Sequence, residues 1–132
     1  GGKNMNIEWI SQEKSNNAIT IYNNNITFSK QAANCFANAY GIAVVFDKEN
    51  QNIVMKRVTQ EDVNNKVFSK EDIYNLTMKP SFGRINSKKL IVELSKYIGL
   101  DFSKKVSYKF SATYNTGTKM LIIDAKEALI HD

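Results

Sequence analysis

The sequence contains one cysteine, one proline and one histidine among its 132 residues. The single cysteine, Cys35, cannot form an internal disulfide bond, which indicates a reducing and therefore cytoplasmic setting. One proline, Pro80, and six glycines leave little material for a long flexible linker. The only histidine, His131, has no second histidine or cysteine at metal-ligand spacing, so we expect no metal site. No apolar run approaches the roughly 20 residues of a membrane-spanning helix, so we expect no membrane association.

The chain also lacks the motifs by which common enzymes are recognised. It has no glycine-rich loop that could hold a phosphate, and no histidine stands near Cys35 in the sequence. The acidic pairs 61–62 and 71–72 lie beside helix-start signals, where they complement the helix dipole. We therefore expect a protein that is not an enzyme and that requires no cofactor.

The net charge of +5 is unevenly distributed along the chain. Residues 1–80 carry nine basic and eight acidic side chains, whereas residues 81–132 carry nine basic and five acidic ones. A positive excess of this size is compatible with binding to a polyanion. It is also typical of lysine- and asparagine-rich compositions without such a function, and both interpretations stay open.

Two stretches of the sequence match each other without a gap. "SKQAANCFANAYGI" begins at Ser29, and "SKKLIVELSKYIGL" begins at Ser87. In each, a serine is suited to cap a helix, apolar residues follow at helical spacing, and a glycine closes the stretch. We expect these glycines, Gly41 and Gly99, to end the helices by adopting a positive φ.

Similar strands surround the two predicted helices. The pattern predicts, for the first copy, strands at 18–22 and 25–29, a helix at 29–41 and a hairpin of 42–47 with 52–58; and for the second copy, a strand at 82–86, a helix at 87–99 and a hairpin of 105–114 with 119–124. The side chains expected to point inward are Ala32, Ala33, Phe36, Ala37, Tyr40, Leu90, Ile91, Leu94, Tyr97, Ile98, Val106, Tyr108, Phe110 and Ala112. One such unit cannot cover its own apolar face.

The fold expected from this pattern is α+β, a single domain over residues 1–132. Two units, approximately 18–58 and 82–124, are predicted to pack about a pseudo-twofold axis and to form an antiparallel sheet or barrel with two principal helices. The connecting segment 59–80 is polar, and a short helix is expected to start at Ser69. The competing interpretation is that two capped helices resemble each other by chance.

Basic residues gather at two places in the second unit. Arg84, Lys88 and Lys89 surround the predicted step from strand to helix, where free backbone N–H groups favour anions. Lys104 and Lys105 begin the predicted hairpin, whose polar side also carries further lysines. Together these five residues form the candidate nucleic-acid site. The alternative is that they are only solvated surface lysines.

The order of parts in "GRINSKKLIVELSKYIGLDFSKKVSYKF…KMLIID" resembles the AbrB/SpoVT swapped-hairpin family of bacterial transition-state regulators, in which a short Gly-Arg-Ile-type strand, a capped helix closed by Leu-Gly and a β-hairpin follow one another. "NNITFSKQAANCFANAYGIAVVFDKENQNIVMKRV" follows the same order more loosely. The resemblance implies a tandem form in which two copies in one chain replace a dimer. It also implies DNA binding through Arg84, Lys88 and Lys89. The chain departs from the family in having Asn86-Ser87 where a proline is usual.

Two hypotheses for function follow. In the first, the chain is a small cytoplasmic, non-enzymatic protein that binds double-stranded DNA and regulates transcription through its basic surface. In the second, it is a non-catalytic accessory module that binds a protein partner, or a second copy of itself, through a sheet edge or an apolar patch. Convergence of the five basic residues would favour the first hypothesis, and acidic residues among them the second.

Overall fold

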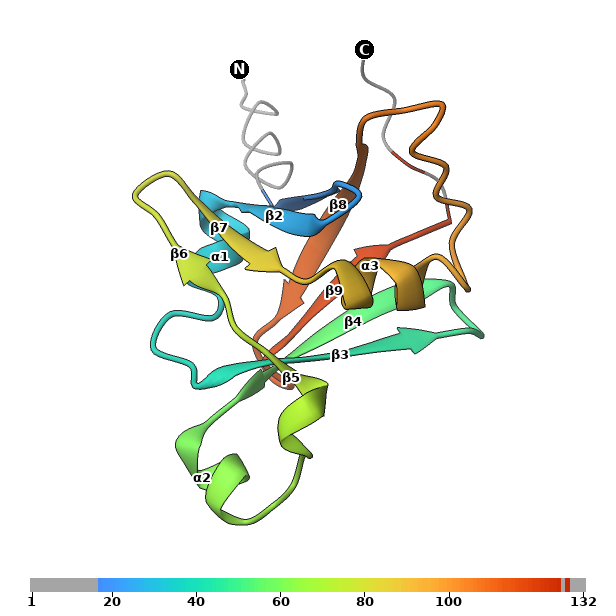
Figure 1. The fold of residues 1–132 in the computed structure, drawn as a ribbon. Coiled ribbons are helices and arrows are strands. Elements are labelled where there is room, and N and C mark those ends of the chain that lie inside the picture. Colours follow the sequence, from blue (N-terminus) through green and yellow to red (C-terminus); the bar gives the residue numbers. More distant parts are fainter. Residues whose placement is uncertain (1–16, 127, 129–132) are drawn as a thin grey trace, which may run out of the picture.

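Antiparallel strands dominate the computed structural model, which describes residues 17–126 and 128 (Figure 1). The elements in chain order are β1 (Ala18–Ile21), β2 (Asn25–Ser29), α1 (Lys30–Asn34), β3 (Gly41–Asp47), β4 (Asn52–Val58), α2 (Gln60–Asn64), the 3-10 turn η2 (Lys70–Asp72), β5 (Ile73–Tyr74), β6 (Thr77–Met78), β7 (Phe82–Asn86), α3 (Lys88–Leu94), β8 (Tyr108–Asn115) and β9 (Met120–Asp124). The described residues thus form a strand-rich α+β domain with few and short helices. His131 lies outside them.

All the strands belong to one sheet with the order β5-β3-β4-β9-β8-β1-β2-β7-β6. The two edge strands, β5 and β6, are separated in the chain only by Asn75 and Leu76. The sheet is therefore curled, because one short segment supplies both of its ends. In Figure 1, β1, β2 and β7 lie above, the β3–β4 hairpin crosses below, and α3 lies between these two levels. The predicted hairpins 42–58 and 105–124 are confirmed, the second with a later start.

Both predicted serine caps are confirmed. The Oγ atom of Ser29 accepts a hydrogen bond from the N–H of Ala32 at 3.4 Å, and that of Ser87 accepts one from Leu90 at 3.1 Å. The helices that follow are much shorter than predicted, since α1 has five residues and α3 seven, with turns after each.

The expected role of the glycines is wrong. Neither Gly41 nor Gly99 has a positive φ, and Asn38, with φ of 65°, is the left-handed residue after α1. Gly41 is instead the first residue of β3. A side chain there would meet β5, because an added Cβ would lie 2.5 Å from Cγ2 of Ile73 and 2.9 Å from the carbonyl oxygen of Tyr74. Close packing of backbones, rather than a turn, therefore explains a glycine at this position.

The core occupies the inner side of the curled sheet. Its largest fully buried side chains are Phe28, Phe110, Ile19, Ile21, Ile26, Ile42, Ile53, Met55, Ile85, Leu121, Ile123 and Val58. Alternation along the strands puts these residues inside, as expected for a half-buried antiparallel sheet. The outward positions are mainly polar on β1, β2, β7 and β8, whereas β3, β4 and β9 carry Val45, Val54 and Ile122 there. Three predicted inward residues are exposed: Tyr40 and Tyr97, each 44% exposed, follow the early ends of the helices, and Val106, 81% exposed, precedes β8.

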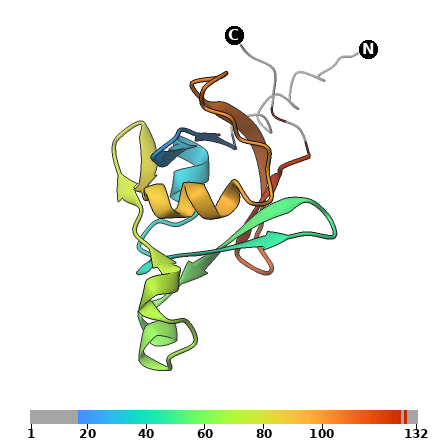
Figure 2. The ribbon, with the colours of Figure 1, turned by 45° about the vertical axis from the view of Figure 1, so that its right-hand side comes forward.

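The segment between the two predicted units extends away from the sheet. Helix α2 begins with a capping box, in which Thr59 Oγ1 accepts from the N–H of Asp62 and the Asp62 carboxylate accepts from the N–H of Thr59. The helix predicted to start at Ser69 is only the 3-10 turn η2. Figures 1 and 2 both show α2 and η2 below the sheet, on the side away from β1 and β2. The same segment then enters the sheet as β5 and β6, two strands that the sequence did not indicate.

Candidate nucleic-acid interface

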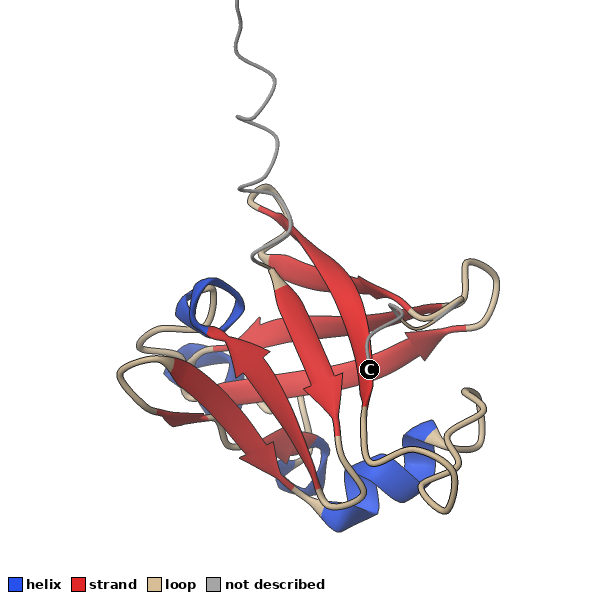
Figure 3. Ribbon diagram, turned by 90° about the horizontal axis from the view of Figure 1, so that it is seen from above, coloured by secondary structure: helices blue, strands red, loops and turns tan. Residues whose placement is uncertain are grey.

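The outer face of the sheet carries a polar row that crosses five strands. Strand register places Thr77 of β6 opposite Arg84 of β7, Arg84 opposite Thr27 of β2, Thr27 opposite Thr20 of β1, and Thr20 opposite Lys109 of β8. The neighbours of these residues along the strands are mostly buried, so the row itself faces outward. Seen from above, the broad sides of the strands are open and the described helices lie at or beneath their margins (Figure 3).

Arg84 is held in place within this row. Its Nε–H donates a hydrogen bond to Oγ1 of Thr27 at 3.3 Å, and its guanidinium carbon lies 4.9 Å from the centre of the Phe82 ring. Thr27 in turn donates to Oδ1 of Asn25 at 2.9 Å. Arg84 is half-buried, so these contacts restrict its side chain while the remaining N–H groups can bind an anion.

A shallow depression of about 290 Å³ lies beside Arg84 on the same face. Its lining residues are Ala18, Thr20, Thr27, Phe28, Ser29, Phe82 and Lys109. Arg84 and Lys109 stand three strand spacings apart in the row, about 14 Å between backbones, with the two threonines between them. Two cations therefore flank a surface of hydroxyl groups bounded by one aromatic ring.

No acidic residue occurs in the strands that build this face. Strands β1, β2, β6, β7 and β8 contain neither aspartate nor glutamate. The whole stretch 73–92 carries four basic residues and no acidic one, while the preceding stretch 59–72 carries four acidic and two basic residues. A phosphate approaching the outer face thus meets no carboxylate from its strands, and this acid-free run was the sequence signal that could have located the face.

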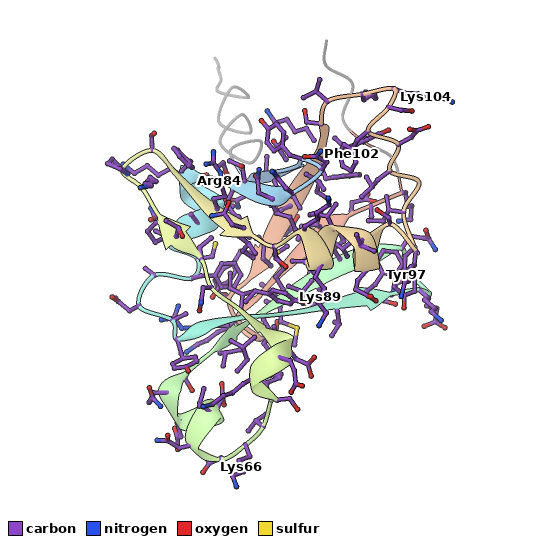
Figure 4. All side chains as sticks on the ribbon, in the orientation of Figure 1. Lys66, Arg84, Lys89, Tyr97, Phe102 and Lys104 are labelled. Carbon is purple, nitrogen blue, oxygen red and sulfur yellow. The ribbon has the colours of Figure 1, made fainter. Side chains whose placement is uncertain are left out.

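The five predicted site residues do not form one cluster. Figure 4 shows Arg84, Lys89 and Lys104 at three separate places on the molecule. Lys88 and Lys89 are both exposed in the first turn of α3, but Lys89 lines a groove on another side of the molecule together with Asp72 and Glu93. Arg84 therefore does not form one site with Lys88 and Lys89, as the sequence had predicted. Outward positions on a strand and on the following helix point in different directions.

Lys104 and Lys105 lie in the segment between α3 and β8 rather than on a strand. The ammonium group of Lys105 lies 5.2 Å from the centre of the Tyr108 ring, at the start of β8. Lys109, four residues further along, belongs to the outer row described above. Tyr108 packs against the core on the inner side of β8, so Lys105 lies over the opposite side of the strand from Lys109. Lys109 is the member of the outer row that the five-residue prediction omitted.

Cys35 and the described acidic residues give no sign of a reactive centre. Burial raises the pKa of the Cys35 thiol, and the thiol donates to the carbonyl oxygen of Gln31 at 3.4 Å. The thiolate is thereby disfavoured at neutral pH. Within residues 17–126 and 128, no three histidine, cysteine, aspartate or glutamate side chains are grouped as metal ligands. None of the helices in the described part of the chain has the length and apolar character needed to cross a bilayer.

Comparison with known proteins gives no relatives. No family model, no curated protein and no solved structure matches the chain. The function must therefore be argued from the chain's own residues.

Proposed function

We propose that the protein binds duplex DNA through the outer face of β7, β2, β1 and β8, and regulates transcription in this way. The observation that carries the proposal is the acid-free outer row in which Arg84 and Lys109 flank a hydroxyl-lined depression. Phosphate contacts from Arg, Lys and Thr side chains supply most of the affinity in such complexes. Lys104 and Lys105, which precede β8, would contribute through the long-range field of the molecule.

The proposal includes a duplicated architecture. We infer that units 18–58 and 82–124 are two copies related by a pseudo-twofold axis, as in a tandem AbrB/SpoVT-like chain. Reciprocal pairing supports this inference: β2 pairs with β7, β4 pairs with β9, α1 lies against β7 and α3 lies against β2. Strand β1 joins β2 to β8, and the segment of β5 and β6 likewise joins β7 to β3. On this inference β5 and β6 correspond to β1, so the second copy starts at about residue 73.

Salt dependence tests the DNA proposal directly. The logarithm of the association constant for a mixed-sequence duplex of about 30 base pairs should fall linearly with the logarithm of the salt concentration. The slope should be roughly −0.9 for each phosphate neutralised. Replacing Arg84→Ala and Lys109→Ala together should weaken binding at low salt by roughly tenfold to a hundredfold and reduce the slope by about 2. Fluorescence anisotropy at several salt concentrations measures both quantities.

The matched control removes two positive charges elsewhere. Lys48→Ala with Lys70→Ala lowers the net charge equally but changes the β3–β4 turn and η2, which lie off the outer face. We expect this control to lose at most severalfold in affinity, through the long-range field alone. Absence of binding at low salt, or equal losses in the two double variants, would remove the outer face as the DNA site.

A further inference from the structure

The outer face of β7, β2 and β1 carries two aromatic side chains besides its polar row. Phe82 begins β7, and Tyr22 directly follows the last residue of β1. Both are half-buried, and neither is among the half-buried apolar side chains that pack against the core. Alternation along the strands puts both rings outward, since Phe82 shares its side of β7 with Arg84, and Tyr22 shares its side of β1 with Thr20.

Strand pairing places the two rings at opposite corners of this part of the face. Phe82 lies opposite Ser29 of β2, and Ser29 Oγ accepts a hydrogen bond at 3.1 Å from the N–H of Ala18, at the start of β1. Tyr22 lies at the other end of β1, where its N–H donates to the carbonyl oxygen of Asn25 at 2.8 Å. The two residues are therefore separated by two strand spacings across the sheet and four residues along it, about 16 Å between backbones.

The polar row with its two cations runs between the two rings. The guanidinium carbon of Arg84 lies 4.9 Å from the centre of the Phe82 ring, and this ring and Lys109 line the same depression of about 290 Å³. Strands β1, β2, β7 and β8 contain neither aspartate nor glutamate. A nucleic-acid strand of about five nucleotides, at a stacked spacing of about 3.4 Å, spans the distance between the rings.

Aromatic rings on such a face contribute to the binding of unpaired bases only. In a duplex each base is stacked between its neighbours inside the helix, so it must leave the stack before a side chain can cover its flat side. The bases of a single strand are free to stack on aromatic side chains and on the planes of arginine guanidinium groups. A face that held phosphates alone would need Arg84 and Lys109 but not the two rings.

We propose that the outer face binds a single-stranded stretch of DNA, with one base stacked on Phe82 and another on Tyr22. The phosphates between these bases lie along the polar row, where Arg84 and Lys109 neutralise them. A duplex is held by the same cations without the two stacking contacts, and therefore less tightly. The inference rests on the proposed function for the choice of DNA and deepens it by naming the form of DNA that this face prefers.

Fluorescence anisotropy with the whole chain tests the preference. The probes are an oligothymidylate of about 12 nucleotides and a mixed-sequence duplex of about 12 base pairs. We expect the single strand to bind about fivefold more tightly or more at the same salt concentration. The NMR ring signals of Phe82 and Tyr22 should shift as it binds. Tighter binding of the duplex, or of a uridine RNA oligomer of the same length, would overturn the proposal.

Removal of the two rings separates stacking from charge. Phe82→Leu with Tyr22→Leu keeps both side chains apolar, and it should weaken binding of the oligothymidylate by about tenfold or more. The salt dependence should not change, because no phosphate contact is lost, whereas Arg84→Ala with Lys109→Ala should reduce the slope for the single strand by about 1.4. Duplex binding by the leucine variant should change by less than about threefold, which also shows that this variant is folded.

The matched control removes two aromatic rings elsewhere. Tyr40 and Tyr97 are each 44% exposed and line other depressions of the surface, so Tyr40→Leu with Tyr97→Leu should alter oligothymidylate binding by less than about twofold. Equal losses in the two leucine variants would overturn the proposal. Salt-dependent duplex binding without a preference for the single strand would overturn this inference alone, whereas ring-dependent binding of the single strand without duplex binding would overturn only the duplex proposal.

Discussion

Strands β8 and β3 hold corresponding places in the two proposed units, yet their surroundings differ. The first half of β8 is covered by β1, which pairs with it at four consecutive residues from Tyr108 to Ser111. Strand β3 is covered by β5 at two residues only. The strand that covers β8 is continuous, whereas the corresponding segment is interrupted at Asn75 and Leu76 between β5 and β6.

This difference separates the two kinds of surface on the molecule. Between β8 and β1 the backbone groups pair with each other, and side chains such as Lys109 project from the outer face. Beside β3, no described strand pairs with the backbone between Val44 and Asp47, next to the aromatic pair of Phe46 and Tyr97. On the proposed duplication, the two units differ here because the strand that covers β8 is intact and the one that covers β3 is broken.

Amide hydrogen exchange should show the largest difference between the two strands. The amides of β3 between Val44 and Asp47 that point away from β4 have no strand partner among the described residues, while the amides of β8 between Tyr108 and Ser111 that point toward β1 are paired with that strand. We expect the former to exchange about a thousandfold faster, since their opening does not require global unfolding. Residue-resolved NMR exchange measures the ratio, and equal protection of the two sets would contradict the open edge.

Alanine substitutions of the two matching glycines, Gly41 and Gly99, should change the stability of the protein by different amounts. Gly41→Ala would force a Cβ against Ile73 and the backbone of Tyr74, so we expect a loss of about 1–3 kcal/mol in the free energy of unfolding. Gly99→Ala meets no atom within 4 Å and should change stability by less than about 0.5 kcal/mol. Urea denaturation measures both variants. Equal stability of the two would mean that β5 is not packed closely on β3.

The strands and helix starts were the predictable part of this fold. The alternation of the hairpin strands and the caps made by Ser29 and Ser87 depend only on residues that are close in the sequence. These features can therefore be predicted from the sequence alone. The helix ends were not predictable in the same way. Tyr40 and Tyr97 continue the helical apolar spacing, but the chain leaves the helix before reaching them, because packing on the curled sheet determines where each helix ends.

Strands of two residues, such as β5 and β6, carry no periodicity and become visible only through their partners. The candidate site was predictable in composition but not in arrangement. Arg84 was predicted to lie with Lys88 and Lys89 at one strand-to-helix junction, but its separation from Lys89 depends on how α3 leaves β7. From the sequence alone, the outer face at Arg84 and the groove at Lys89 were therefore predicted to be one surface.

The smallest predicted effect concerns Asp72 and Glu93, the two carboxylates that line the groove between β3 and α3. Asp72→Asn with Glu93→Gln should lower the pKa of Tyr74 but leave it above the ordinary value, because burial, the largest cause of the shift, remains. Between the unfolded and the raised folded pKa the native state binds more protons than the unfolded state, so stability falls as pH rises through this alkaline window. The double variant should narrow this pH range, because the pKa of Tyr74 in its folded state lies closer to that of the unfolded state. NMR titration of the Tyr74 ring measures the shift, with Asp124→Asn as the control. If the control lowers this pKa as much as the double variant does, the shift does not come specifically from Asp72 and Glu93.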